Sequence, residues 1–289
     1  MERRIRMPNV KIVTDSSCTI EQSVRDELNI TVIPLSVMID DVVYPDDDEL
    51  TGERFMEMMA QAKNLPKTSQ PPIGYFAELY DELGKDGSPI VSIHMSHTLS
   101  GTAEAARQAT FLSGSNVTVI DCGFIDQSQA FQVIEAAKLA QEGASLEEVL
   151  AGVEKVKDHS KLFIGISSLD NLVKGGRISR VAGVISSVLN MRVVMELEDG
   201  ELLPITKGRG KKTFSKWFAA FKDELAKVNV KQIGISYAGK LDFIDEAKQA
   251  LQEMFPDMHI PVLHTNPIVA THTGPGAFAI MYYCLLYTS

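Results

Sequence analysis

Hydroxyl side chains, a histidine and a glycine gather in one short segment, Ser96–Ala106 (SHTLSGTAEAA). The segment follows Pro89–Met95, an apolar run typical of a buried strand, and it leads into an alanine-rich helical pattern. A helix that begins near Gly101 would place Ser100 at or near the N-cap. The first turn of a helix has unpaired N–H groups and the positive end of the dipole, and glycine lets a ligand approach the backbone. The segment is therefore a candidate anion site. Capping of its own helix by Ser100 is the alternative interpretation.

Three further segments resemble this turn, because each is rich in hydroxyls and lies where we expect a strand to lead into a helix. They are Thr14–Ser17 (TDSS), Lys67–Gln70 (KTSQ) and Thr271–Gly276 (THTGPG), in which Pro275 suits the first position of a helix. In an open α/β sheet such turns gather at the carboxyl ends of the strands, where ligands bind. Four turns of this kind favour one shared site for a small anionic group over four independent helix caps.

Two side chains are candidate partners for such an anion. His272 lies between Thr271 and Thr273, and the alternative is a structural histidine bonded to backbone. Arg209 lies in the basic segment Lys207–Lys212. A guanidinium turned inward would offer a carboxylate or phosphate two parallel donors, whereas an ordinary basic loop would leave it in solvent.

A second unusual segment is Ser167–Arg180 (SSLDNLVKGGRISR). Paired glycines at positions 175 and 176 interrupt any helix, and Arg177 and Arg180 follow them. One interpretation is a tight connection between domains with its arginines in water. The other is a flexible cationic element that docks a partner or gates a pocket.

Familiar catalytic motifs fail on their spacing. A nucleophile elbow around Ser100 would need glycines where Thr98 and Thr102 stand. A phosphate-binding loop ending at Thr213 would need a glycine where Ile205 stands. The Gly-Pro-Gly segment has too few residues after it for a dinucleotide-binding unit. The sequence thus contains a site without an obvious catalyst, which favours a binding protein that needs no cofactor.

Strand-like and helix-like runs alternate along the chain, which predicts an α/β fold. We expect two α/β domains with mostly parallel sheets, residues 1–160 and 161–289. Asp199-Gly200 predicts a hairpin in the second domain. Ile30–Ile39 is expected to be one long strand, and the apolar run after Pro275 is expected to be a buried final helix.

The composition restricts the class of partner. The formal net charge of −10 over 289 residues disfavours nucleic acid and anionic membrane surfaces. No run approaches the roughly 20 apolar residues that cross a bilayer, so we expect no stable membrane insertion. The basic start lacks the apolar stretch of a signal peptide, which predicts a cytoplasmic protein. His94 and His97 offer no complete ligand set, so we expect no metal.

Five ordered motifs resemble the DegV family, which includes the fatty-acid-binding subunits of bacterial fatty acid kinase. The motifs are Lys11–Ser17, Thr68–Pro71, Ser96–Thr102, Leu169–Arg180 and His272–Gly276, and together they span almost the whole chain. The resemblance implies one long-chain fatty acid held at the cleft between two α/β domains. It also implies that this chain performs no chemistry alone. A separate ATP-dependent kinase subunit would convert the presented carboxylate to an acyl phosphate, which feeds phospholipid synthesis.

The resemblance also implies roles for single residues. Thr68 and Ser100 would donate hydrogen bonds to the carboxylate, His272 would join their network, and Arg209 would supply positive charge. Arg177 and Arg180 would belong to the surface that meets the kinase. The local patterns add Gly101 and Thr273 to the predicted ligand contacts.

Two other classes of function stay open from the sequence. The chain could be an enzyme that acts on a small anionic metabolite through Ser100 or His272. It could also be a regulatory interaction protein with Arg177 at its interface.

Overall fold

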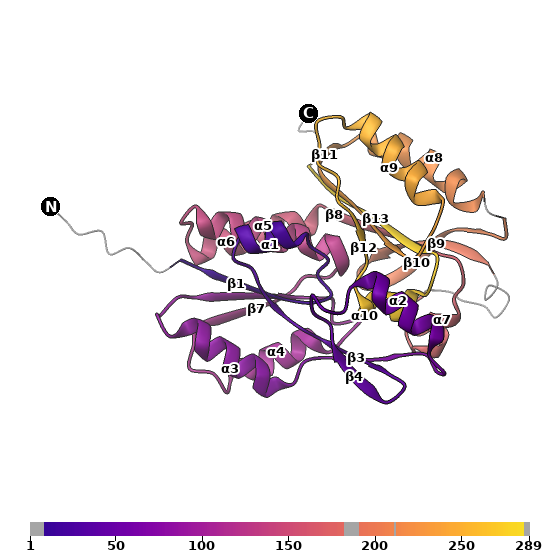
Figure 1. Ribbon diagram of the computed structural model, residues 1–289. Coiled ribbons are helices and arrows are strands. Elements are labelled where there is room, and N and C mark those ends of the chain that lie inside the picture. Colours follow the sequence, from indigo (N-terminus) through magenta and orange to yellow (C-terminus); the bar gives the residue numbers. More distant parts are fainter. Residues whose placement is uncertain (1–8, 182–190, 211, 286–289) are drawn as a thin grey trace.

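Three β-sheets organise the described part of the chain (Figure 1). The computed structural model describes residues 9–181, 191–210 and 212–285. Sheet A is parallel, with strand order β2-β1-β6-β7. Its strands are β1 (Lys11–Asp15), β2 (Thr31–Ile33), β6 (Ile90–His94) and β7 (Val117–Asp121).

Helices cover both faces of sheet A, as the alternating sequence pattern predicts (Figure 1). On one face lie α1 (Gln22–Glu27), α5 (Asp126–Gln141) and α6 (Leu146–Asp158). On the other face lie α3 (Ile73–Gly84) and α4 (Thr102–Thr110). Buried aliphatic side chains of β1 and β6 alternate between the two faces, so that Ile12 packs toward α5 and Val13 toward α3 and α4.

Sheet C has six strands in the order β10-β9-β8-β13-β11-β12. The strands are β8 (Ser160–Ile166), β9 (Arg192–Glu198), β10 (Glu201–Gly208), β11 (Asn229–Ala238), β12 (Val262–His264) and β13 (Ala277–Leu285). Two helices, α8 (Thr213–Leu225) and α9 (Phe243–Met254), pack on one face through an aromatic core that includes Phe214, Phe218 and Phe278. The other face carries Leu162 and Ile166 into the space between the two halves of the chain.

A small antiparallel sheet B, in the order β4-β3-β5, lies beside this space. It consists of β3 (Ser36–Ile39), β4 (Val42–Pro45) and β5 (Lys67–Ser69). The remaining elements are α2 (Gly52–Gln61), α7 (Asp170–Lys174), the 3₁₀ turn η1 (Ile178–Arg180) and α10 (Pro267–Thr273). Helix α10 packs in one apolar cluster with Val37 and Phe55, so the C-terminal part of the chain contacts sheet B directly.

The structure corrects two local predictions. Ile30–Ile39 is divided after Ile33, and the two pieces lie in different sheets, because Pro34 cannot donate to a ladder. The run Ala277–Leu285 is a strand, not a helix, since it lies between β8 and β11 and is buried on both faces. A continuous apolar run does not distinguish these two states.

The expectation of mostly parallel sheets holds for sheet A and is wrong for sheet C. In the described part of sheet C only β11 and β12 pair in parallel, and the other neighbours are antiparallel. All strands of sheets A and B precede residue 160, and sheet C begins there. The division into domains at residue 160 stays a prediction.

Candidate functional site

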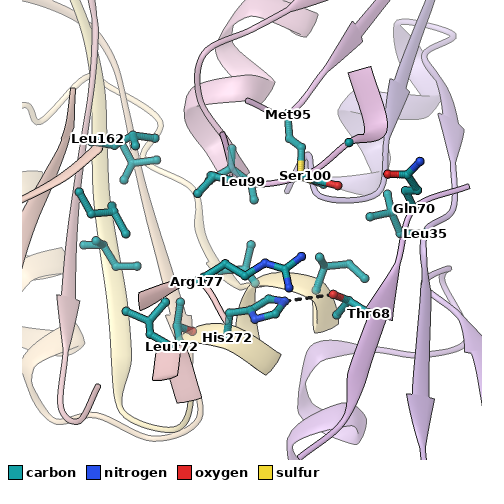
Figure 2. A pocket seen from close by; sticks show the side chains of 18 of the residues that line it. Leu35, Thr68, Gln70, Met95, Leu99, Ser100, Leu162, Leu172, Arg177 and His272 are labelled. Carbon is teal, nitrogen blue, oxygen red and sulfur yellow. Dashed lines mark hydrogen bonds between the residues drawn. The ribbon is translucent and has the colours of Figure 1, made fainter. Parts of the chain in front are cut away.

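A cavity of about 390 Å³ lies between sheet C and the loops of sheets A and B, which is a usual size for a small-molecule site. One wall consists of Leu162, Ile164 and Ile166, which alternate along β8 and therefore share a face. Figure 2 shows Leu162 on the opposite side of the cavity from Thr68. The other apolar lining residues are Leu35, Met95, Leu99, Ile125, Leu172, Leu197, Leu202, Ile268 and Val269.

Polar side chains concentrate where β5, α4 and α10 meet this cavity. Thr68 and His272 form a hydrogen bond of 3.0 Å between Oγ1 and Nε2, drawn as a dashed line in Figure 2. Ser100, Gly101 and Thr273 line the same cavity. Five of the predicted ligand contacts are thus brought together from segments that are far apart in the sequence.

His272 occupies the last turn of α10, not the start of a helix as predicted. Asn266 caps this helix by accepting a hydrogen bond from the Val269 N–H, and Pro267 lies in its first turn. Gly274 ends it with a φ of 74°, a conformation that glycine adopts without strain.

Burial and the nearby charge of Arg177 lower the pKa of His272 to about 4, so its imidazole is neutral at pH 7. Its Nδ1 is buried and has no partner, whereas Nε2 faces Thr68. An unpaired buried N–H costs more than an unpaired acceptor, which places the proton on Nε2. His272 then donates to Thr68 Oγ1, and the Thr68 hydroxyl is left to donate into the cavity.

Arg177 also lines the cavity, whereas the sequence assigned it to an outer docking surface. Its Nη1 donates to the Gly175 carbonyl at 2.9 Å. Figure 2 shows its guanidinium beside His272, pointing toward the side on which Thr68 lies. Gly175 packs tightly here, because a Cβ at this position would lie 2.4 Å from His272 Nδ1. The paired-glycine segment therefore brings a cation to the polar end of the cavity.

Ser100 precedes the N-cap of α4, which is Gly101, and Gly101 has no side chain with which to cap. The Ser100 hydroxyl bonds the Thr102 hydroxyl at 2.9 Å. A Cβ on Gly101 would lie 2.4 Å from Gln70 Oε1, so glycine leaves room for the Gln70 side chain beside the start of α4. Ser100 and Gly101, which immediately precede the first turn of α4, line the polar end of the cavity.

Two predicted residues are not placed in this group. Arg209 is exposed in the connection between β10 and α8, and the described residues that line the cavity do not include it. Its role as a ligand contact stays a prediction. Arg180 ends η1, and its side chain lies outside what the structure describes.

The Thr14–Ser17 turn forms a separate buried network and does not join the cavity. Asp15 Oδ2 accepts from His94 Nδ1 at 2.9 Å, and His94 Nε2 bonds the Ser92 hydroxyl at 2.7 Å. This order of groups resembles a hydrolytic triad, but all three side chains are fully buried. Burial alone would raise the pKa of Asp15. The hydrogen bonds from His94, Ser17 and the Met95 N–H outweigh this effect and hold the pKa below its usual value. The network fastens β1 to β6.

Known proteins with this architecture identify the family. The fold and the cavity define an α/β architecture with an apolar pocket that has one polar end. A family model described as "Uncharacterised protein, DegV family" matches residues 9–284. A DegV domain-containing protein of Streptococcus pneumoniae is 55% identical over 95% of this chain and 98% of that protein. The DegV domain-containing protein YejH of Lactococcus lactis is 53% identical over 94% of this chain and 98% of that protein. The chain belongs to the DegV family.

Two solved structures share the fold. A fatty-acid-binding DegV family protein from Thermus thermophilus matches with a TM-score of 0.86 and 28% identity, covering 96% of this chain and all of that one. DegV from Bacillus subtilis, described as a fatty acid binding protein, matches with the same TM-score and identity, covering 96% of this chain and 99% of that one. In the described residues, no helix has the length and apolarity to traverse a bilayer.

Proposed function

We propose that this chain binds one long-chain fatty acid in the cavity between sheet C and sheets A and B. The observation that carries the proposal is the division of one cavity into a long apolar wall and a single polar end. The acid's carboxylate would lie near Thr68, Ser100, Gly101, His272 and Arg177, and its tail would extend along β8. The fatty-acid-binding relatives from Thermus thermophilus and Bacillus subtilis support this proposal.

The energetics of the two ends agree with this orientation. Each buried CH₂ contributes about 0.8 kcal/mol, so about ten methylenes contribute about 8 kcal/mol. Removing a carboxylate from water is costly unless hydrogen-bond donors replace its hydration. Here the donors are the Thr68 and Ser100 hydroxyls and the first turn of α4, and Arg177 supplies the positive charge.

The chain would act as a binding subunit and not as an enzyme. It would present the carboxylate to a separate ATP-dependent kinase subunit in the cytoplasm, which forms an acyl phosphate for phospholipid synthesis. Arg177 and Arg180 would belong to the surface that contacts that subunit. Arg209 would supply positive charge for the carboxylate. This part of the proposal is supported by the family resemblance and by the lack of a phosphate-binding loop in the sequence.

The competing enzymatic function would use Ser100 or His272 as a catalyst. In the described part of the chain His272 pairs with Thr68, and Ser100 pairs with Thr102, so Ser100 and His272 do not form a nucleophile–base pair with each other. We therefore favour the binding function.

Trapping with hydroxylamine distinguishes the binding function from the enzymatic function. Acyl phosphate made from oleate and ATP is captured as an acyl hydroxamate, which mass spectrometry detects. We expect the product only when this chain and the kinase subunit are both present. Product from this chain and ATP alone would contradict the binding-subunit proposal. Steady turnover of an acyl ester that is lost in Ser100→Ala would favour the enzyme.

A further inference from the structure

The polar end of the cavity is assembled from two halves of the chain that must be held in register. Thr68 and Ser100 belong to the N-terminal half, whereas His272 and Thr273 are carried by α10. Their relative placement depends on whatever fixes α10 against the loop that contains Ser100.

A continuous series of hydrogen bonds joins these two elements through Asp126. The Ser100 N–H donates to Ser96 O, and the Ser96 N–H donates to Phe124 O at 2.8 Å. Ile125 follows and lines the cavity, and Asp126 follows it as the first residue of α5. The loop that carries Ser100 is thus fastened to the segment that carries Asp126.

Asp126 binds the C-terminal half with both carboxyl oxygens, one next to the start of α10 and the other on β11. Oδ2 accepts from the Thr265 hydroxyl and Oδ1 from the Ser236 hydroxyl, each at 2.6 Å. Thr265 immediately precedes Asn266, the N-cap of α10, whose side chain also donates to Ser17 O at 3.0 Å. The start of α10 is therefore fixed to the N-terminal half by two bonds, one from Thr265 to Asp126 and one from Asn266 to Ser17.

The backbone and burial of Asp126 indicate a specific role for its side chain. Its φ is 60°, a left-handed conformation that is uncommon outside glycine and persists where the surroundings impose it. It is 2% exposed. Burial raises the pKa of the carboxyl, whereas the hydroxyls of Ser236, Thr265 and Thr19 lower it.

We infer that Asp126 is a positioning residue for the carboxylate site: through Thr265 it fixes the start of α10, and with this short helix the His272 of its last turn, relative to Ser100 and Thr68. The inference rests on the proposed function. Without this link the apolar wall would persist, because β8 is held by its own ladder to β9 and β13. Loss of the link therefore impairs recognition of the carboxylate more than recognition of the tail.

Competition between acids and matching alcohols tests this selectively. Delipidated protein is incubated with equimolar C14, C16 and C18 fatty acids and the corresponding alcohols, and native mass spectrometry gives the acid-to-alcohol ratio of the bound species. We expect wild type to select acids. In Asp126→Asn and Thr265→Val we expect the ratio to fall at least about tenfold, the effect of one hydrogen bond to a charged group.

Ser128→Ala is the matched control. Ser128 lies on the same helix and also bonds across the two halves, to Lys161 O at 3.2 Å on β8, and among the described residues its side chain forms no hydrogen bond to α10. We expect it to lower the melting temperature while the ratio stays at the wild-type value.

Each outcome has a distinct meaning. If wild type takes up neither acids nor alcohols, the proposed function fails. If wild type selects acids and the folded variants keep its ratio, the inference about Asp126 is overturned while the proposed function stands. If Asp126→Asn does not fold, Thr265→Val decides alone. Failure of both to fold would also overturn the inference, because the link would then serve the fold and not the recognition of acids.

Discussion

The neutral state of His272 predicts how the stability of the lipid-free protein depends on pH. The folded-state pKa of His272 is about 4, below the ordinary value of 6.5, because the ring is buried and lies near Arg177. Between these two values the unfolded chain binds a proton that the folded chain does not. The contribution of His272 is therefore fully present above pH 6.5 and is lost as the pH falls toward 4.

The magnitude follows from the two pKa values. At pH 5 the difference in proton binding lowers the free energy of unfolding by about 2 kcal/mol relative to pH 7.5. His272→Gln removes the titrating group, and its amide can still donate to Thr68. We expect the loss of stability between pH 7.5 and pH 5 to be smaller in this variant by about 2 kcal/mol.

Urea unfolding of delipidated wild type and His272→Gln at the two pH values measures this difference. Titration of the His272 ring by NMR, identified by the signal missing from the variant, gives its pKa directly. A pKa at or above 6.5, or the same pH dependence in both proteins, would refute the assignment of a buried neutral imidazole that donates to Thr68.

Three further changes test other parts of the site and fold. Thr68→Val removes the proposed donor and should weaken oleate binding at least about tenfold in calorimetry; unchanged affinity would exclude Thr68 as a contact. Gly175→Ala places a Cβ 2.4 Å from His272 Nδ1 and should shift that ring's NMR signals and weaken acid binding, whereas unshifted signals would contradict the tight packing. Asp15→Asn should cost about 3 kcal/mol of stability in urea. Because the pKa of Asp15 is lowered, its contribution is present above its unfolded value and is lost as the pH falls through the folded one, so the variant should lose less stability on acidification. Equal acid sensitivity of the two proteins would contradict this.

The hydroxyl-rich turns of the sequence are sufficient to predict that several residues of the polar end of the cavity lie together. Thr68, Ser100 and His272 do lie together, although the reasons differ from those predicted. Thr68 belongs to the antiparallel sheet B, and His272 ends α10. The Thr14–Ser17 turn carries the same kind of residues, but Asp15 turns it into a buried network, because a carboxylate placed inside must find donors there.

The apolar wall was not predicted, because it depends on strand pairing. Leu162, Ile164 and Ile166 share one face of β8, but the residues that lie opposite them become known only with the order of sheet C. The sequence favours a helix for the Ala277–Leu285 run for a related reason: a strand buried on both faces shows no alternation. Arg177 reaches the cavity only because the paired glycines bring its segment against α10.

Native mass spectrometry of the freshly purified protein tests the central proposal most directly. We expect an adduct of fatty-acid mass at one copy per chain, and organic extraction then names the acid. If the protein is bare, fatty acids of C14 to C18 are added, and we expect the same adduct together with a higher melting temperature. A chain that carries no acyl adduct in either experiment, and whose melting temperature does not rise, would contradict the fatty-acid-binding function.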